Sequence, residues 1–308
     1  MQKRLISMVL ALSMALTAMP LPALAQSAPP DTASAAALAE ENGDVTNIYT
    51  SNSSGKPIGD LGDSGDSWSY DEASKTLTLK TGTFRLYNYG HDSYNNCIQW
   101  NVKIEPGATL QEARIGSEYH NGYTVTNAGT ISGGTFYGKV ICEAGAVISG
   151  GTFKGAARVD AAGGEVTIED GTLEEVSYTS GMTVKAAGTL TINGGTFTGG
   201  QITVKNDDYG ELTITGGNFT QPGENRYAVY NANTATISGG TFTAESTVVG
   251  SDYFAGEANT GKLTISKGTF TRESRGTAIS MGAGADLTLT GGTFQTQGDG
   301  SSYVISLA

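Results

Sequence analysis

Several tyrosines stand beside amide and carboxylate side chains, in segments that lie between copies of the chain's main repeat. A tyrosine ring offers a flat apolar face with a polar tip. Sugar rings stack on such faces, and neighbouring Asn or Asp side chains bond sugar hydroxyls. We expect these rings to act as stacking surfaces for carbohydrate, or else to cover corners of the fold and pack on the next repeat. The candidate rings are Tyr209, Tyr227, Tyr230 and Tyr253.

Acidic turns are the second group of residues with chemistry of their own. Asp207 and Asp208 share one turn, and the stretch DLGDSGDS carries Asp60, Asp63 and Asp66. Carboxylate oxygens are the ligands that Ca²⁺ takes in proteins, although a solvated acidic linker has the same composition. The sequence leaves a calcium site open, with Asp207 and Asp208 as its candidate ligands, and it predicts no other cofactor.

Groups that could catalyse a reaction are scattered along the chain. A polysaccharide lyase or hydrolase needs clustered acids with a base, or two carboxylates at a set distance. The arginines fall in different segments, the only histidines are His91 and His120, and no G-x-S-x-G motif occurs. We expect a binding protein without catalysis, and a lyase or hydrolase is the alternative.

A short repeated sequence motif indicates the secondary-structure elements that must position these residues. GTISGGTF, which ends at Phe136, returns as LTINGGTF, LTITGGNF, ATISGGTF, LTISKGTF and LTLTGGTF. A repeat of about 20 to 30 residues is typical of a solenoid. An earlier copy, LTLKTGTF, is expected to end at Phe84. The closing residues of the other copies are Phe136, Phe153, Leu173, Phe197, Phe219, Phe242, Phe270 and Phe294.

The phrase itself indicates the type of solenoid. In LTITGGNF, Leu212 and Ile214 alternate with threonines, which is the period of a strand with one buried face. Gly216 and Gly217 then allow a tight corner, and Phe219 points inward again. The pattern predicts an all-β fold, a right-handed parallel β-helix of about nine to ten coils. Segments between the copies are expected to be loops outside the stack.

Outward-facing threonines are expected to form two columns on this solenoid. A flat threonine array resembles the ice-binding face of some β-solenoids. Threonine is also a favourable strand residue whose hydroxyls bond along a ladder, and this structural interpretation is preferred. One column comprises Thr191, Thr213, Thr236, Thr264 and Thr288, and the other comprises Thr196, Thr241, Thr269 and Thr293.

The domain organisation follows from composition. Residues 1–25 combine a basic start, an apolar run and an Ala-Leu-Ala cleavage signal, which predicts a secretory signal peptide and an extracellular protein without a membrane span. Residues 26–66 are expected to be a flexible lead, and residues 67–308 to form the β-helix. The closing stretch QTQGDGSSYVISLA looks like the first strand of another coil, and solenoids normally end in a polar cap. This predicts that the natural chain continues, and the alternative is that this end packs on a partner.

The net charge limits the classes of partner, and the two cysteines raise the question of a disulfide. The chain has a net charge of −12, which falls to −14 when Lys3 and Arg4 leave with the signal peptide. A strongly acidic protein is not expected to bind nucleic acid or an anionic membrane. Secretion permits a disulfide between Cys97 and Cys142, but the sequence alone does not decide whether their backbones approach closely enough.

A family resemblance agrees with this interpretation. GDSWSYDEASKTLTLKTGTF, from Gly65 to Phe84, and the T-I-S-G-G-T-F coils that follow resemble secreted right-handed β-helix surface proteins of gut Firmicutes. Some of these are grouped as carbohydrate-binding-domain-containing or adhesin-like. The resemblance implies a glycan-binding, adhesin-like protein whose partner is a polysaccharide or a surface glycan. A structural stalk of a larger surface protein is a further alternative.

Overall fold

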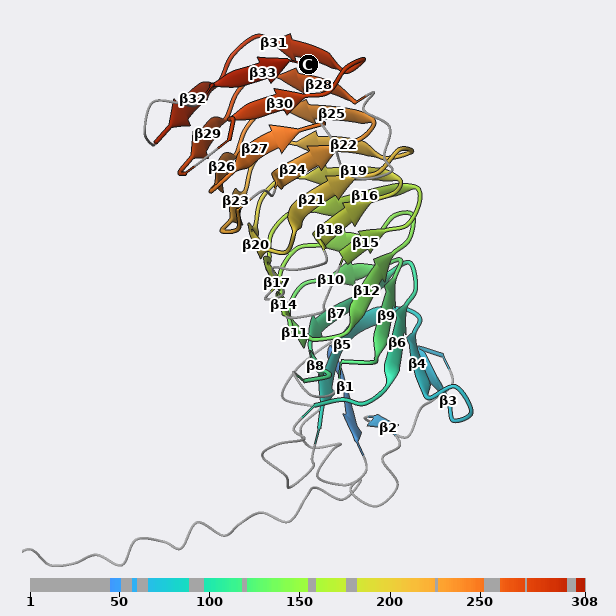
Figure 1. The fold of residues 1–308 in the computed structure, drawn as a ribbon. Coiled ribbons are helices and arrows are strands. Elements are labelled where there is room, and N and C mark those ends of the chain that lie inside the picture. Colours follow the sequence, from blue (N-terminus) through green and yellow to red (C-terminus); the bar gives the residue numbers. More distant parts are fainter. Residues whose placement is uncertain are drawn as a thin grey trace, which may run out of the picture.

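Every regular element in the described part of the chain is a β-strand, and the strands stack coil on coil into an elongated solenoid (Figure 1). The structure is a computed structural model, and it describes residues 45–50, 57–59, 66–88, 97–117, 121–154, 159–175, 182–224, 227–251, 261–274, 276–297 and 303–307. The predicted fold class, an all-β right-handed parallel β-helix, is confirmed. The described residues include no helix that could cross a membrane.

Three sheets run along the solenoid axis. Sheet A contains β2 (Pro57–Gly59), β1 (Val45–Thr50), β5 (Gly82–Tyr87), β7 (Ala108–Glu112), β10 (Thr130–Ile131), β13 (Val147–Ile148), β16 (Glu165–Ile168), β19 (Thr189–Ile192), β22 (Glu211–Ile214), β25 (Thr234–Ile237), β28 (Lys262–Ile265) and β31 (Asp286–Leu289). Sheet B contains β3 (Trp68–Asp71), β4 (Thr76–Leu79), β6 (Asn101–Ile104), β9 (Thr124–Asn127), β12 (Lys139–Cys142), β15 (Val159–Ala161), β18 (Met182–Ala186), β21 (Ile202–Asn206), β24 (Tyr227–Asn231), β27 (Thr247–Gly250), β30 (Ile279–Met281) and β33 (Ile305–Leu307). Sheet C contains β8 (Arg114–Ile115), β11 (Thr135–Phe136), β14 (Thr152–Lys154), β17 (Thr172–Glu175), β20 (Thr196–Gly199), β23 (Asn218–Gln221), β26 (Thr241–Ala244), β29 (Thr269–Arg272) and β32 (Thr293–Thr296). The strands of these sheets pair in parallel except for the antiparallel pairs β1–β2 and β3–β4. From β6 to β32, each coil contributes one strand to each sheet.

The core consists of register-matched columns of apolar side chains. The predicted phenylalanine column is present in sheet C, where Phe197, Phe219 and Phe242 pair with one another across successive coils. Their rings stack with centroids 4.6 to 4.7 Å apart, which is close to the spacing of hydrogen-bonded strands. One strand per coil therefore places one ring directly on the next, and burial of these faces holds the coils together.

The threonine columns are also in the predicted register. Thr191, Thr213 and Thr236 pair in sheet A, while in sheet C Asn218 lies between Thr196 and Thr241. These side chains are exposed or partly buried. They form the polar outer face of strands whose other face is the core.

The segments between the repeated phrases form a third sheet, and the expectation that they lie outside the stack was wrong. Sheet B has a buried inner column of its own, with Val184, Val204 and Val229 paired across β18, β21 and β24. The closing residues Ile305–Leu307 form β33, which pairs with β30 in the same sheet. The strands of this column contain no repeated glycine pair or phenylalanine. In the sequence, their valines are therefore not distinguished from apolar residues in variable loops.

The earliest copy of the repeat is offset by one sheet. LTLKTGTF places Leu77 and Leu79 in β4 of sheet B and Phe84 in β5 of sheet A, where Phe84 pairs with Leu110. Phe84 therefore extends the leucine and isoleucine column and is not part of the phenylalanine column. Glycine corners also lead from sheet B into sheet A, as at Gly107 and Gly129, so a strand, a glycine and a second strand do not by themselves tell which corner is present.

Strand β1 lies inside the range that composition predicts as a flexible lead. It pairs in parallel with β5, matching Ile48 to Leu86 and Tyr49 to Tyr87, and Ile48 is fully buried. The rest of the predicted lead, and the predicted signal peptide, lie outside the described residues apart from β2 and Asp66. The first sheet thus gains a strand just before the predicted solenoid.

Both cysteines are buried free thiols, and burial raises the pKa of Cys142 to about 12. Since a buried neutral thiol is unreactive, we expect neither Cys97 nor Cys142 to react with a thiol reagent in the native protein. Both thiols should react with the reagent after the protein is unfolded in denaturant. Reductant should leave the melting temperature unchanged. Mass spectrometry after alkylation of the unreduced, unfolded protein would contradict this if it found fewer than two modified cysteines.

Candidate functional site

The structure separates the tyrosines that the sequence grouped. Tyr209 is 86% exposed in the turn before β22, whereas Tyr230 is fully buried in β24 and is inaccessible to a ligand. Tyr227 is partly buried and packs edge-on against Tyr230, with ring centroids 5.4 Å apart. Tyr253 lies outside the described residues. Tyr209 is the only one of the four that the structure describes as a fully exposed ring.

The predicted calcium ligand Asp207 is held by two lysines. Its carboxylate forms ion pairs of 2.5 Å with Lys185 and 2.9 Å with Lys205. Burial alone would raise the pKa of Asp207, but hydrogen bonds from both lysines lower it below its ordinary value. Asp208 is exposed in the same turn. The described residues include no cluster of three potential metal ligands. Because Lys185 and Lys205 both pair with Asp207, Ca²⁺ at this turn would have to displace their ammonium groups.

A groove among the first coils of the solenoid brings together aromatic, charged and amide side chains. It has a volume of about 430 Å³ and lies where the first coils turn from sheet A into sheet C. We call it the corner groove. Its described lining residues are Leu86, Tyr87, Asn88, Ile98, Glu112, Ala113, Arg114, Gly134 and Thr135.

A β-bulge shapes one wall of the corner groove. Between β5 and β7 the register shifts, so that Phe84 pairs with Leu110 but Arg85 pairs with Glu112. Gln111 is the extra residue, and both Gln111 and Glu112 are exposed. Among the described strand pairs this is the one with a register shift. Bulges often re-aim side chains at functional sites, and here two consecutive side chains reach the outer face.

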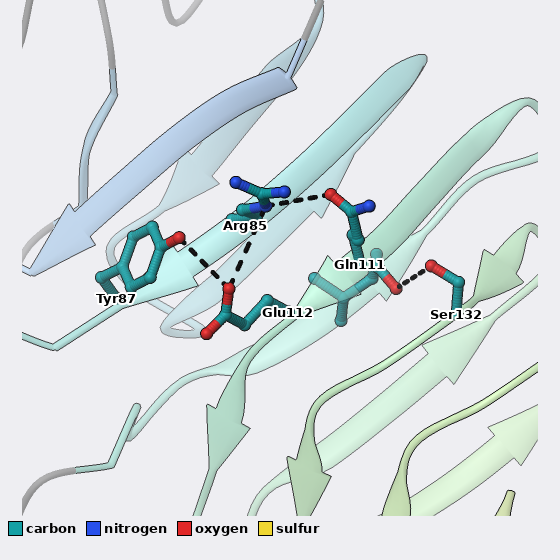
Figure 2. Close-up of polar contacts among 6 residues, drawn as sticks. Arg85, Tyr87, Gln111, Glu112 and Ser132 are labelled. Carbon is teal, nitrogen blue, oxygen red and sulfur yellow. Dashed lines mark hydrogen bonds and ion pairs between the residues drawn. The ribbon is translucent and has the colours of Figure 1, made fainter. Parts of the chain in front are cut away.

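The bulge builds a polar cluster beside the groove (Figure 2). Figure 2 shows Arg85 between two acceptors, with its Nε 2.9 Å from Oε1 of Gln111 and 4.0 Å from the Glu112 carboxylate. The Tyr87 hydroxyl donates a 3.2 Å hydrogen bond to the same carboxylate. Glu112 is therefore compensated by a cation and by a phenol, and its position is restrained from two sides.

Tyr87 gives the groove an aromatic wall. Its ring stacks on Tyr49 of β1, with centroids 5.5 Å apart and planes 21° apart. Burial raises the pKa of Tyr87 above its ordinary value, and the Glu112 carboxylate raises it further. The phenol therefore remains a neutral hydrogen-bond donor over the physiological pH range, and the ring is held in place by its neighbour.

Arg114 breaks the pattern of sheet C on the opposite wall. It pairs with Thr135 at the start of a column that continues through threonine, or asparagine at one coil, to Thr293. The Arg114 guanidinium lies over the Tyr137 ring, 5.8 Å from its centroid. No described carboxylate forms an ion pair with it. Arg114 is the one charged residue among the described members of this column.

Together these side chains can hold a polar ligand of a few rings in size. The groove combines an aromatic wall, amide and hydroxyl groups at Asn88 and Thr135, and the charged pair Glu112 and Arg114. Ligand sites are typically concavities of this size with a few oriented polar groups. The sequence does not predict this grouping, because these residues come from separate strands in successive coils. Arginine in a threonine column was the one signal available.

Comparisons with known proteins give a distant structural relative and no family. No family model matches the chain, and no curated protein matches it. Among solved structures, it is similar to a polysaccharide lyase-like protein from C. thermocellum, solved as a gadolinium derivative. The identity is 17%, the TM-score is 0.33, and the match covers 85% of this chain and 96% of that one. A match this weak carries no argument about activity, so a functional assignment has to come from the corner groove.

Proposed function

We propose that the protein is an exported, adhesin-like glycan-binding protein that holds a saccharide in the corner groove without cleaving it. The observation that carries the proposal is the convergence of three departures from the repeat at one concavity. These are the bulge at Gln111, the arginine at a threonine position and the paired rings of Tyr49 and Tyr87. Proteins tend to break their own local rules at functional sites.

The chemistry of the lining supports a sugar ligand. Sugar rings have apolar faces and hydroxyl edges, and the groove offers the Tyr87 ring together with donors and acceptors on Asn88, Glu112 and Thr135. Export is supported by residues 1–25, whose basic start, apolar run and Ala-Leu-Ala site are typical of a signal peptide. The acidic chain gives no support to a nucleic acid as partner.

Binding is favoured over hydrolysis by the acid content of the groove. Most glycoside hydrolases use two carboxylates flanking the scissile bond. Among the described lining residues Glu112 is the one carboxylate, and it accepts a hydrogen bond from Tyr87 while Arg85 lies 4.0 Å away. These contacts restrain it as an acceptor for ligand hydroxyls. A lyase or hydrolase therefore has less support than a binding protein.

Tyr87→Ala is expected to weaken glycan binding about tenfold or more, because it removes the aromatic wall and a charge-assisted hydrogen bond. A glycan array of the purified protein would first identify a binding sugar, and titration calorimetry would then measure the affinity of each variant. The melting temperature of Tyr87→Ala should be followed in parallel, since the ring packs on Tyr49.

Tyr209→Ala is the matched control, because it removes an exposed ring outside the corner groove. It should leave affinity unchanged. Loss of binding in Tyr209→Ala, with retention in Tyr87→Ala, would move the site to the turn before β22. No binding to any glycan by the folded protein would refute the proposed function and favour a structural stalk.

A further inference from the structure

The described charged side chains in and beside the corner groove carry a net charge opposite in sign to that of the whole chain. The protein has a net charge of −12, yet Arg85, Glu112 and Arg114 together contribute two positive charges and one negative charge. Arg85 and Glu112 lie 4.0 Å apart, and Tyr87 also donates to Glu112. The positive charge that remains is that of Arg114. A concave site of one sign concentrates ions of the other sign.

Arg114 has features of a binding group that go beyond a surface charge. It is exposed, lines the groove and has no described acidic partner. Its guanidinium lies over the ring of Tyr137, which is buried. A cation over an aromatic face is attracted by the ring's quadrupole, which reduces the freedom of a long side chain. The planar group is thereby oriented before any ligand arrives.

The column position shows that the fold does not require this arginine. Seven other coils have threonine and one has asparagine at the same register position, from Thr135 to Thr293. The sheet therefore accepts threonine at this register position, and strand pairing does not need a long cation there. The column borders the groove at two described positions, Arg114 and Thr135, and the arginine stands at one of them.

We propose that Arg114 recognises an anionic group on the sugar, so that the corner groove takes an acidic glycan whose residues carry a carboxylate or a sulfate. The inference rests on the proposed glycan-binding function and names the ligand class of the same site. The fork of guanidinium N–H donors matches the oxygens of such groups in a bidentate manner. Glu112 does not oppose this, because Arg85 lies beside it and Tyr87 donates a hydrogen bond to it.

The test compares three oligosaccharides of matched length by titration calorimetry: an oligogalacturonate, a sulfated galactan and a neutral galactan. We expect at least one acidic probe to bind tenfold or more tightly than the neutral one, and its affinity to fall as salt rises. Arg114→Gln should weaken that acidic probe by about tenfold to a hundredfold, and should leave weak neutral binding unchanged. Arg114→Lys should restore only part of the affinity, since lysine lacks the planar fork.

Lys267→Gln is the matched control, because it removes the same charge from an exposed site on a distant coil. It should not change affinity. Equal binding of acidic and neutral probes, an equal loss for both in Arg114→Gln, or an equal loss of acidic affinity in Lys267→Gln would each overturn the proposal while leaving glycan binding intact. If the folded protein bound none of these probes and no other glycan, the proposed function would be overturned as well. The relative strength of the carboxylated and sulfated probes decides which anion the site prefers.

Discussion

Phe219→Ala should destabilise the protein by about 3–5 kcal/mol, the largest loss expected from any single core truncation in the solenoid. Phe219 is 1% exposed and lies between Phe197 and Phe242, with centroids 4.7 and 4.6 Å away and ring planes 6° apart. Removing the ring leaves two stacking faces without a partner. Each coil of a solenoid contacts only the coil before it and the coil after it. No other part of the protein can therefore move in to fill the cavity that the substitution leaves.

Urea denaturation followed by two probes would measure this loss. Far-ultraviolet circular dichroism reports all strands, whereas fluorescence reports Trp68 and Trp100, which are buried in the first coils. We expect the two transitions to coincide in the wild type and to separate in Phe219→Ala, because the cavity weakens coupling between the halves of the solenoid.

Phe294→Ala provides the matched control at the last coil. Phe294 is partly exposed and stacks on one described neighbour, Phe270, at 4.9 Å. We expect less than half the loss of Phe219→Ala. A loss below about 1 kcal/mol for Phe219→Ala, or equal losses for the two variants, would contradict the view that the stacked ring column is the main source of coil cohesion.

Gly239→Ala should destabilise the protein by about 3 kcal/mol or more through overpacking. A Cβ atom at this glycine would lie 2.0 Å from the carbonyl oxygen of Thr215 in the preceding coil. That oxygen belongs to the backbone, so the clash can be relieved only by separating the two coils. The expected signature is a lower urea midpoint with a loss of parallel-strand dichroism before the main transition.

Two other glycines separate steric clash from backbone strain. A methyl group added at Gly163 would meet no atom within 4 Å, and this glycine has no positive φ, so Gly163→Ala should change stability by less than about 0.5 kcal/mol. Gly82 also has open space but a φ of +103°, so Gly82→Ala should cost about 1–3 kcal/mol through strain alone. If Gly239→Ala were no worse than Gly163→Ala, the close approach of adjacent coils would not be essential to the fold.

Most of the candidate site could not be predicted from the sequence. The aromatic residues between repeats suggested stacking surfaces, but Tyr230 proved to be buried in a third sheet and Tyr227 packs against it. Burial of an outward side chain depends on what the neighbouring coils place over it, which no local pattern records. Tyr87 is one of several tyrosines that lie between copies of the repeat, and nothing in its own segment distinguishes it from the others.

The amino-acid sequence by itself determined the coil, because alternation of apolar and polar residues and the glycine corner are local features that recur at each turn. It therefore predicted the parallel β-helix, the phenylalanine column through Phe219 and the threonine columns. Only the tertiary structure decided the third sheet and the corner groove. The bulge at Gln111 and the meeting of Tyr87, Glu112 and Arg114 arise from the register between adjacent coils. Register is a property of two strands together, so neither strand's sequence specifies it alone.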